Sequence, residues 1–126
     1  MIIAIGTDVI EVDRIRRAVD HAEWGERFRQ RIFTPGEIAY CTRRARYAES
    51  FAARFAAKEA VMKALGVGLG AFGFHDVEVQ RDDGGRPSLV VVGAAELLAV
   101  ERGVVAWQLS LTHTTLSAGA VVVAVG

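Results

Sequence analysis

The chain has 126 residues, 52% of them hydrophobic, and its 15 basic and 15 acidic residues give a formal net charge of zero. This size predicts one compact domain, residues 1–126, and no apolar run approaches the roughly 20 residues that cross a membrane. One cysteine and three scattered histidines exclude an internal disulfide and do not form a zinc pattern, and no secretory leader is present, so we expect a cytoplasmic protein.

The first half of the chain predicts one strand followed by helices. Residues 1–9 are apolar and β-branched, as in a buried strand, and residues 10–19 and 24–32 are short helical patterns rich in arginine. The stretch from Thr34 to Glu37 is a capping box with proline at the first helical position, and it opens a helix towards residue 44. A long helix then runs from about residue 50 to Gly66.

The second half predicts mainly strands. After a glycine-rich loop over residues 66–73, the pattern predicts a hairpin of residues 75–81 and 88–92, a helix over residues 94–102, and a second strand pair of residues 106–113 and 118–125. A β-α-β-β order therefore appears twice. We predict an α+β fold with a pseudo-duplicated sheet packed on the long central helix, and a last strand apolar enough to be buried on both faces, in part against another subunit.

Arginine dominates the cationic first half. Residues 1–63 carry twelve basic and nine acidic residues, a net charge of +3, whereas residues 64–126 carry three basic and six acidic, a net charge of −3. Residues 27–46 alone hold six arginines and one acid, Glu37. This pattern favours an acidic protein partner, with a solvated helical face as the alternative, and nucleic acid is disfavoured because the whole chain is not basic.

Both lysines of the chain, Lys58 and Lys63, lie in the long helix on either side of Glu59. Bulky residues form one stripe of this helix and alanines form another, so we expect both faces to be buried. Ionisable groups on such a helix need partners, which favours a metal or phosphate site. The alternative for Glu59 and Lys63, spaced i,i+4, is a minor helix-stabilising pair.

Asp8 at the end of the first strand, together with Glu59 and Lys63, suggests phosphoryl-transfer chemistry. Two carboxylates from different elements can hold Mg²⁺, whose remaining ligands are waters and substrate phosphates. An ammonium group beside the ion balances the remaining phosphate charge. For Asp8 the alternative is a helix N-cap at the strand-to-helix turn.

Several motifs together resemble the holo-acyl-carrier-protein synthases of the phosphopantetheinyl transferase superfamily. They cover almost the whole chain in the order and spacing of that family: Ile5-Gly-Thr-Asp8 with Arg14, Ile32-Phe-Thr-Pro-Gly-Glu37, Ala53-Arg-Phe-Ala-Ala-Lys-Glu-Ala60 with Lys63-Ala-Leu-Gly66, and Leu109-Ser-Leu-Thr-His113. The resemblance implies Mg²⁺-dependent transfer of the phosphopantetheine arm of coenzyme A to a serine of an acidic acyl carrier protein, with release of adenosine 3′,5′-bisphosphate. It also implies a homotrimer with active sites at subunit boundaries.

The resemblance further implies roles for matched residues. Asp8 and Glu59 would hold Mg²⁺, Glu59 or a metal-bound water would deprotonate the serine, and Lys63 would assist departure of the bisphosphate. The coenzyme A site would be lined by Arg54, Lys58, Gly66 and His113. Arg14 would face the carrier protein.

The chain departs from the family pattern in two places. Thr114, Thr115 and Leu116 stand where many members carry a charged residue, and Met62 stands where some carry a small polar one. Two other classes of function remain open at this point: a trimeric module that binds coenzyme A or carrier protein without turnover, and a Mg²⁺-dependent phosphohydrolase. The preferred carrier protein, of fatty-acid or polyketide type, does not follow from the sequence.

Overall fold

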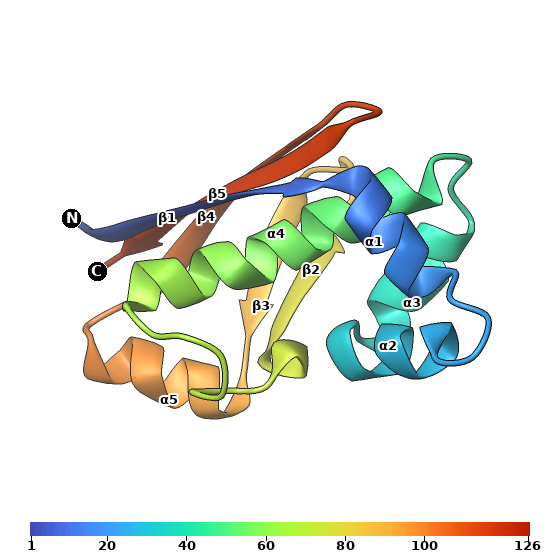
Figure 1. The fold of residues 1–126 in the computed structure, drawn as a ribbon. Helices are drawn as coiled ribbons and strands as arrows, with labels where there is room; N and C mark the ends of the chain where they lie inside the picture. The colour runs from blue at the N-terminus through green and yellow to red at the C-terminus, as the bar shows by residue number, and fades with distance from the viewer.

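The computed structural model describes residues 1–126 and contains five helices, one 3-10 turn and five strands (Figure 1). The elements occur in the predicted order, and their bounds lie within a few residues of the predicted ranges. They are β1 (Ile2–Glu11), α1 (Val12–Val19), α2 (Gly25–Ile32), α3 (Pro35–Thr42), α4 (Tyr47–Leu65), η1 (Phe74–Asp76), β2 (Val77–Arg81), β3 (Pro87–Val91), α5 (Gly93–Glu101), β4 (Ala106–His113) and β5 (Ser117–Val125). The α+β fold class is confirmed.

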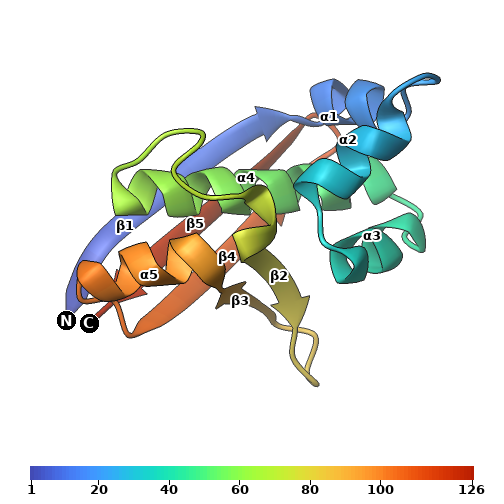
Figure 2. The same cartoon turned by 90° about the horizontal axis from the view of Figure 1, so that it is seen from below.

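The strands form two antiparallel sheets. The larger has the order β1-β5-β4, so the two ends of the chain lie side by side in it, and the smaller is the β2-β3 hairpin. Figure 2 shows α4 lying across the larger sheet, with the hairpin to one side and α1, α2 and α3 gathered at one end of α4. The β-α-β-β order occurs twice along the chain. The strand pairing does not keep the two units apart, however, because β1 pairs with β5, which also pairs with β4.

The alanine face of α4 packs on the larger sheet. Ala56, Ala57 and Ala60 are fully buried, and the strand residues below them are also small. A Cβ atom at Gly6 of β1 would lie only 1.9 Å from the backbone oxygen of Ala60. Backbone contact between β1 and α4 thus requires glycine on the strand and alanine on the helix, and it fixes how close Asp8 comes to the helix.

The bulky face of α4 packs on the other elements. The ring of Phe51 lies 4.8 Å from that of Phe33, and the ring of Phe55 lies 5.9 Å from that of Phe74. α4 ends at Gly66, whose φ of 70° is the left-handed conformation that glycine favours at this position. The expectation that both faces of this helix are buried is confirmed.

The outer face of the larger sheet is uncovered in one chain. On β5, Ala120 and Val122 are buried beneath α4, whereas Val121 between them is 43% exposed. Ile5 and Val9 of β1 point to the same outer side and are exposed. One face of β5 is therefore buried within the chain, and burial of the second face requires another molecule.

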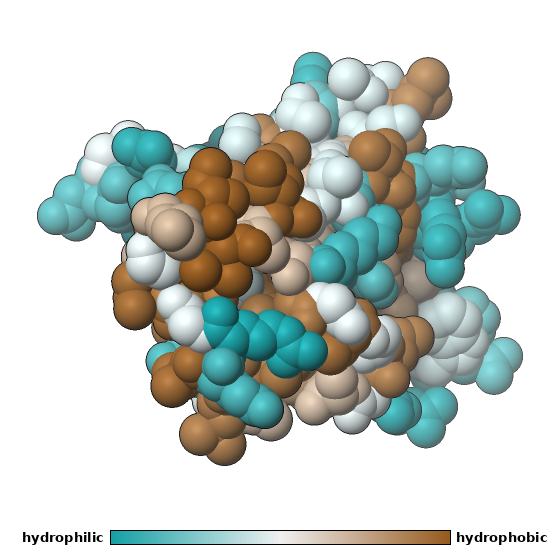
Figure 3. All heavy atoms as spheres, turned by 90° about the vertical axis from the view of Figure 1, so that its left-hand side faces the viewer, coloured by the Kyte–Doolittle hydropathy of each residue, from teal (hydrophilic) through white to brown (hydrophobic).

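A second apolar surface lies at the end of the molecule that carries both termini. Figure 3 shows hydrophobic atoms gathered on this end. The exposed apolar residues of the termini, α5 and the segment after it are Met1, Ile2, Leu97, Val100 and Val105. None of the helices has the length and apolar character needed to span a membrane.

Candidate active site

Asp8 and Lys63 meet between β1 and α4. Alternate residues of β1 face the helix, and Asp8 is one of these, half-buried between Gly6 and Ile10. The Nζ atom of Lys63 lies 3.0 Å from the Oδ1 atom of Asp8. The side chains are 57% and 16% exposed, respectively, so this ion pair is open to a ligand from solvent. The interpretation of Asp8 as a helix cap is not borne out, because the N-cap of α1 is Glu11.

Glu59 lies one turn before Lys63 and belongs to the same cluster. Burial raises the pKa of the Glu59 carboxyl, the negative charge of Asp8 raises it further, and the charges of Lys63 and Arg14 lower it. These four groups therefore act on one another. Lys63 forms its ion pair with Asp8, and none with Glu59, so the simple helix-stabilising pair is not what the structure contains.

Two neighbouring carboxylates of like charge provide the donor set expected for Mg²⁺. No group of three or more histidine, cysteine or acidic side chains that could hold a metal ion is present. Mg²⁺ is commonly bound by one or two carboxylates with waters and substrate phosphates as the remaining ligands. Asp8 and Glu59 fit this requirement, and a cation between them would relieve the repulsion that raises the pKa of Glu59.

Lys58 points away from this cluster and into the interior. Its side chain is fully buried, and its Nζ atom lies 2.8 Å from Glu37 Oε1 and 3.0 Å from the carbonyl oxygen of Phe74, with a third bond to the carbonyl oxygen of Val77. Burial lowers the pKa of Lys58, and the charge of Glu37 opposes this shift. All three N–H groups are occupied, so Lys58 does not line a surface cleft, contrary to the role implied by resemblance.

Glu37 is the partner that makes this burial possible. Its Oε1 atom also accepts a hydrogen bond from the backbone N–H of Thr34 at 3.0 Å, which closes the predicted capping box, and its Oε2 atom accepts one from the N–H of Val79 at 2.9 Å. One carboxylate therefore joins α3, α4 and β2. The capping motif was visible in the sequence, but its pairing with Lys58 was not.

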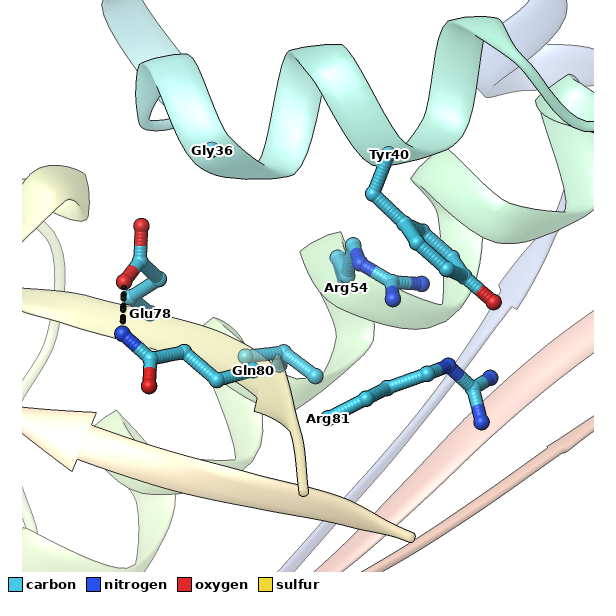
Figure 4. Close-up of a pocket in the computed structure, with 7 residues that line it drawn as sticks. Gly36, Tyr40, Arg54, Glu78, Gln80 and Arg81 are labelled. Carbon is cyan, nitrogen blue, oxygen red and sulfur yellow. Dashed lines mark hydrogen bonds between the residues drawn. The ribbon is translucent and has the colours of Figure 1, made fainter. Parts of the chain in front are cut away.

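Arg54 lines a pocket between α3, α4 and β2, of about 260 Å³ (Figure 4). Its guanidinium carbon lies 4.4 Å from the centre of the Tyr40 ring, and Arg81 stacks near the same ring at 5.1 Å. The Nη1 atom of Arg54 donates to the carbonyl oxygen of Ser50, whereas its buried Nε–H has no partner. Arg54 is therefore a buried pocket residue, 2% exposed, with one N–H group that has no partner in the chain.

His113, the last residue of β4, pairs with Glu49 in the first turns of α4. Its Nδ1 atom lies 2.7 Å from Glu49 Oε1. The imidazole is 43% exposed, whereas the carboxylate of Glu49 is 5% exposed and has the Nε atom of Arg46 at 4.0 Å from its second oxygen. Sequence analysis missed Glu49, because it lies 64 residues from His113 in no recognisable motif.

The expected site residues fall on two sides of α4. Arg54 and Glu59 are five residues apart, so at about 100° per residue they point roughly 140° apart. Asp8, Glu59 and Lys63 form one group with Arg14 nearby, whereas Arg54 lies on the side that faces α3 and β2. Gly66 is exposed at the end of the helix. The chain alone does not bring all expected residues into one cleft.

Thiol chemistry is excluded as a basis for activity. Cys41 is fully buried, and burial raises its pKa to about 12, with the positive charge of Arg54 opposing the shift. A thiol in this state is neither accessible nor ionised near neutral pH. The carboxylates and the ammonium group between β1 and α4 remain the candidate reactive groups.

The chain matches the family model of the 4′-phosphopantetheinyl transferase superfamily over residues 4–125. It is 47% identical over 116 residues to a holo-acyl-carrier-protein synthase of Moorella thermoacetica, covering 92% of this chain and 88% of that protein. A relative of the same name from Koribacter versatilis is 48% identical over 115 residues, covering 90% of each chain. The chain belongs to the holo-acyl-carrier-protein synthase family.

Solved structures agree with this assignment. A crystal structure of the holo-acyl-carrier-protein synthase from Neisseria meningitidis matches with a TM-score of 0.87 at 34% identity, covering all of both chains. The synthase from Bacillus anthracis, crystallised in complex with CoA (3′,5′-ADP), matches with a TM-score of 0.78 at 35% identity, over 98% of this chain and 96% of that one. The expected family, fold and enzyme class are confirmed.

Proposed function

We propose that this enzyme transfers the 4′-phosphopantetheine arm of coenzyme A to a serine of an apo acyl carrier protein, with Mg²⁺ as cofactor and adenosine 3′,5′-bisphosphate as the second product. The observation that carries this proposal is the cluster of Asp8, Glu59 and Lys63 at the surface of a chain from this family. Its two carboxylates suit a metal ion and its ammonium group suits a phosphate. We place the reaction in the cytoplasm.

The residues of the cluster have distinct roles in this proposal. Mg²⁺ bound between Asp8 and Glu59 would neutralise charge on the diphosphate of coenzyme A. Glu59, whose carboxyl pKa is raised by burial, is suited to accept the proton of the attacking serine hydroxyl. Lys63, whose side chain is 57% exposed, would donate a hydrogen bond to the phosphate oxygen of the departing bisphosphate.

The surface of α2 supports an acidic carrier protein as partner. Trp24, Arg27, Phe28 and Arg31 line a hollow of about 360 Å³ on this helix. Arg27 and Arg31 are exposed and form no ion pair, so their charges are free to attract an acidic surface. The aromatic side chains offer an apolar contact between them. Arg14, exposed on α1, lies close enough to the carboxylate cluster for its charge to lower the pKa of Glu59.

A homotrimer is part of the proposal. Ile5, Val9 and Val121 leave the outer face of the larger sheet apolar and exposed, as in a surface that associates with another subunit. The separation of Arg54 from Glu59 around α4 is also consistent with a coenzyme A site completed across a subunit boundary. Each subunit would then supply the carboxylate side of one site and the arginine side of the next.

The test is a reaction of purified enzyme with coenzyme A, Mg²⁺ and an apo acyl carrier protein, followed by mass spectrometry of the carrier. Gain of the phosphopantetheine arm is the expected result. Release of nucleotide without that gain would indicate a phosphohydrolase, and neither product would indicate a binding module. Fatty-acid and polyketide carriers compared at equal concentration would establish which is preferred.

A further inference from the structure

The pairing of His113 with a buried carboxylate has a chemical consequence. An ionised carboxylate only accepts hydrogen bonds, so the 2.7 Å contact with Glu49 requires a proton on Nδ1 of His113. The neutral ring then has no proton on Nε2. In this state the outward nitrogen is an acceptor, and it cannot bind a phosphate oxygen, which is an acceptor too.

A second histidine of the chain has the opposite arrangement. The Nδ1 atom of His21 accepts hydrogen bonds from the backbone N–H groups of Glu23 and Trp24, at 3.2 and 3.3 Å. Neutral His21 must therefore carry its proton on Nε2, which is the form that a free imidazole can offer to an anion. The protein contacts Nδ1 in both residues, but this nitrogen donates in His113 and accepts in His21, so the two neutral rings carry their proton on different nitrogens.

The surroundings of Glu49 are cationic. Arg46 approaches its second carboxylate oxygen, and Arg16 of α1 lines the same hollow of about 230 Å³ together with Tyr47. Two of these side chains also have partners outside the hollow: Arg16 forms an ion pair with Asp13, and Tyr47 donates a hydrogen bond to Asp20. His113 and Arg46 thus share one buried carboxylate, and both side chains keep an exposed part that an anion can reach.

We propose that Glu49 is a positioning residue that holds His113 with Nδ1 protonated and Nε2 directed outward, so that the imidazole takes up a proton when a phosphate of coenzyme A binds to it. This inference rests on the proposed function for the identity of the ligand. On binding, the His113 ring gains one proton from solvent. Its Nε2–H then donates to the phosphate oxygen, and its Nδ1–H continues to donate to Glu49. The doubly protonated ring lies between two anions, which favours it.

The first arm of the test needs no ligand. Nitrogen-resolved NMR of the three histidine rings at about pH 8, where imidazoles are mostly neutral, should show the proton of His113 on Nδ1 and that of His21 on Nε2. Glu49→Gln retains an acceptor oxygen of the same shape and should preserve the Nδ1 form. Glu49→Ala should shift His113 towards the Nε2 form without changing His21. A wild-type His113 protonated on Nε2 would overturn the positioning role.

The second arm measures proton uptake on binding. Calorimetric titration with coenzyme A at about pH 8, in two buffers of different ionisation enthalpy, should give uptake approaching one proton per site for the wild type. His113→Ala should abolish it. Glu49→Ala should reduce it, because a neutral ring protonated on Nε2 can donate without gaining charge. Tight binding by the wild type with no proton uptake would overturn the phosphate contact.

The substrate itself identifies the phosphate involved. Dephospho-coenzyme A lacks the phosphate on the ribose, so loss of proton uptake with this ligand assigns the contact to that group, and persistence assigns it to the diphosphate. Either result supports the proposal. If coenzyme A does not bind at all, both the proposed function and the phosphate contact are wrong, whereas failure of the NMR arm alone leaves the transfer activity intact.

Discussion

Replacing Lys58 by methionine should destabilise the protein severely, because this fully buried residue has a structural role and lies away from the proposed metal cluster. The substitution keeps the apolar stem but removes the ammonium group that pairs with Glu37. Glu37 is fully buried, so its charge would remain in the interior without a cation. Breaking a buried ion pair by removing one partner costs about 3–5 kcal/mol.

This cost corresponds to a large change in melting temperature. An unfolding entropy of ~2.1 cal/mol/K per residue gives ~0.26 kcal/mol/K for 126 residues, so Tm should fall by roughly 11–19 °C. Thermal and urea denaturation at one fixed protein concentration measure the effect, since oligomerisation also contributes to stability. Lys58→Arg should be destabilising too, because a fully buried site shaped around an ammonium group has no space for a guanidinium group.

Two comparison variants make the reasoning testable. Lys63→Met removes an ammonium from the same helix, but the Lys63 side chain is 57% exposed, so stability should change by less than about 1 kcal/mol. The double variant Glu37→Gln with Lys58→Met removes both charges and should be more stable than the sum of the single losses predicts. If Lys58→Met were as stable as Lys63→Met, the buried pair would not hold α3, α4 and β2 together as described.

The remaining predictions concern the active site and the close packing beneath it. Glu59→Gln should reduce turnover sharply. In EDTA this variant should also lack the loss of stability that the wild type shows as the pH rises above the ordinary pKa of a glutamate, about 4.3, because burial and Asp8 raise the pKa of Glu59 and folding therefore disfavours its charged form; equal pH dependence in urea denaturation would contradict this. Lys63→Arg should lower kcat by roughly 10²-fold to 10⁴-fold at saturating coenzyme A, and wild-type kcat would show that charge alone suffices. Arg14→Glu should raise KM for the carrier more than KM for coenzyme A, and salt should weaken the wild-type interaction; a salt-independent KM would argue against electrostatic docking. Gly6→Ala should destabilise by about 3 kcal/mol or more in urea denaturation, because its Cβ would overlap the backbone of α4, and a stable variant would show that β1 and α4 can separate.

The sequence alone determined the order of the elements and predicted which carboxylates and which lysine form the candidate site. Local signals specified the helix boundaries: the capping box at Thr34 and the left-handed Gly66 both lie where their residue types predict. The two apolar faces of α4 followed from helical periodicity, which is a property of neighbouring residues. Asp8, Glu59 and Lys63 stood out because carboxylates and lysine are costly on such a helix and at the end of a buried strand.

Only the tertiary structure decided which charges face solvent and which face each other. Lys58 and Lys63 lie five residues apart on one helix, yet one is fully buried and the other is 57% exposed. The difference arises because other elements bring Glu37 and Val77 to Lys58. His113 and Glu49, 64 residues apart in the sequence, are also brought together only by the packing of their elements. Periodicity gives the direction of a side chain from its helix, but its partner depends on how strands and helices pack, and that is set by backbone contacts such as Gly6 against Ala60.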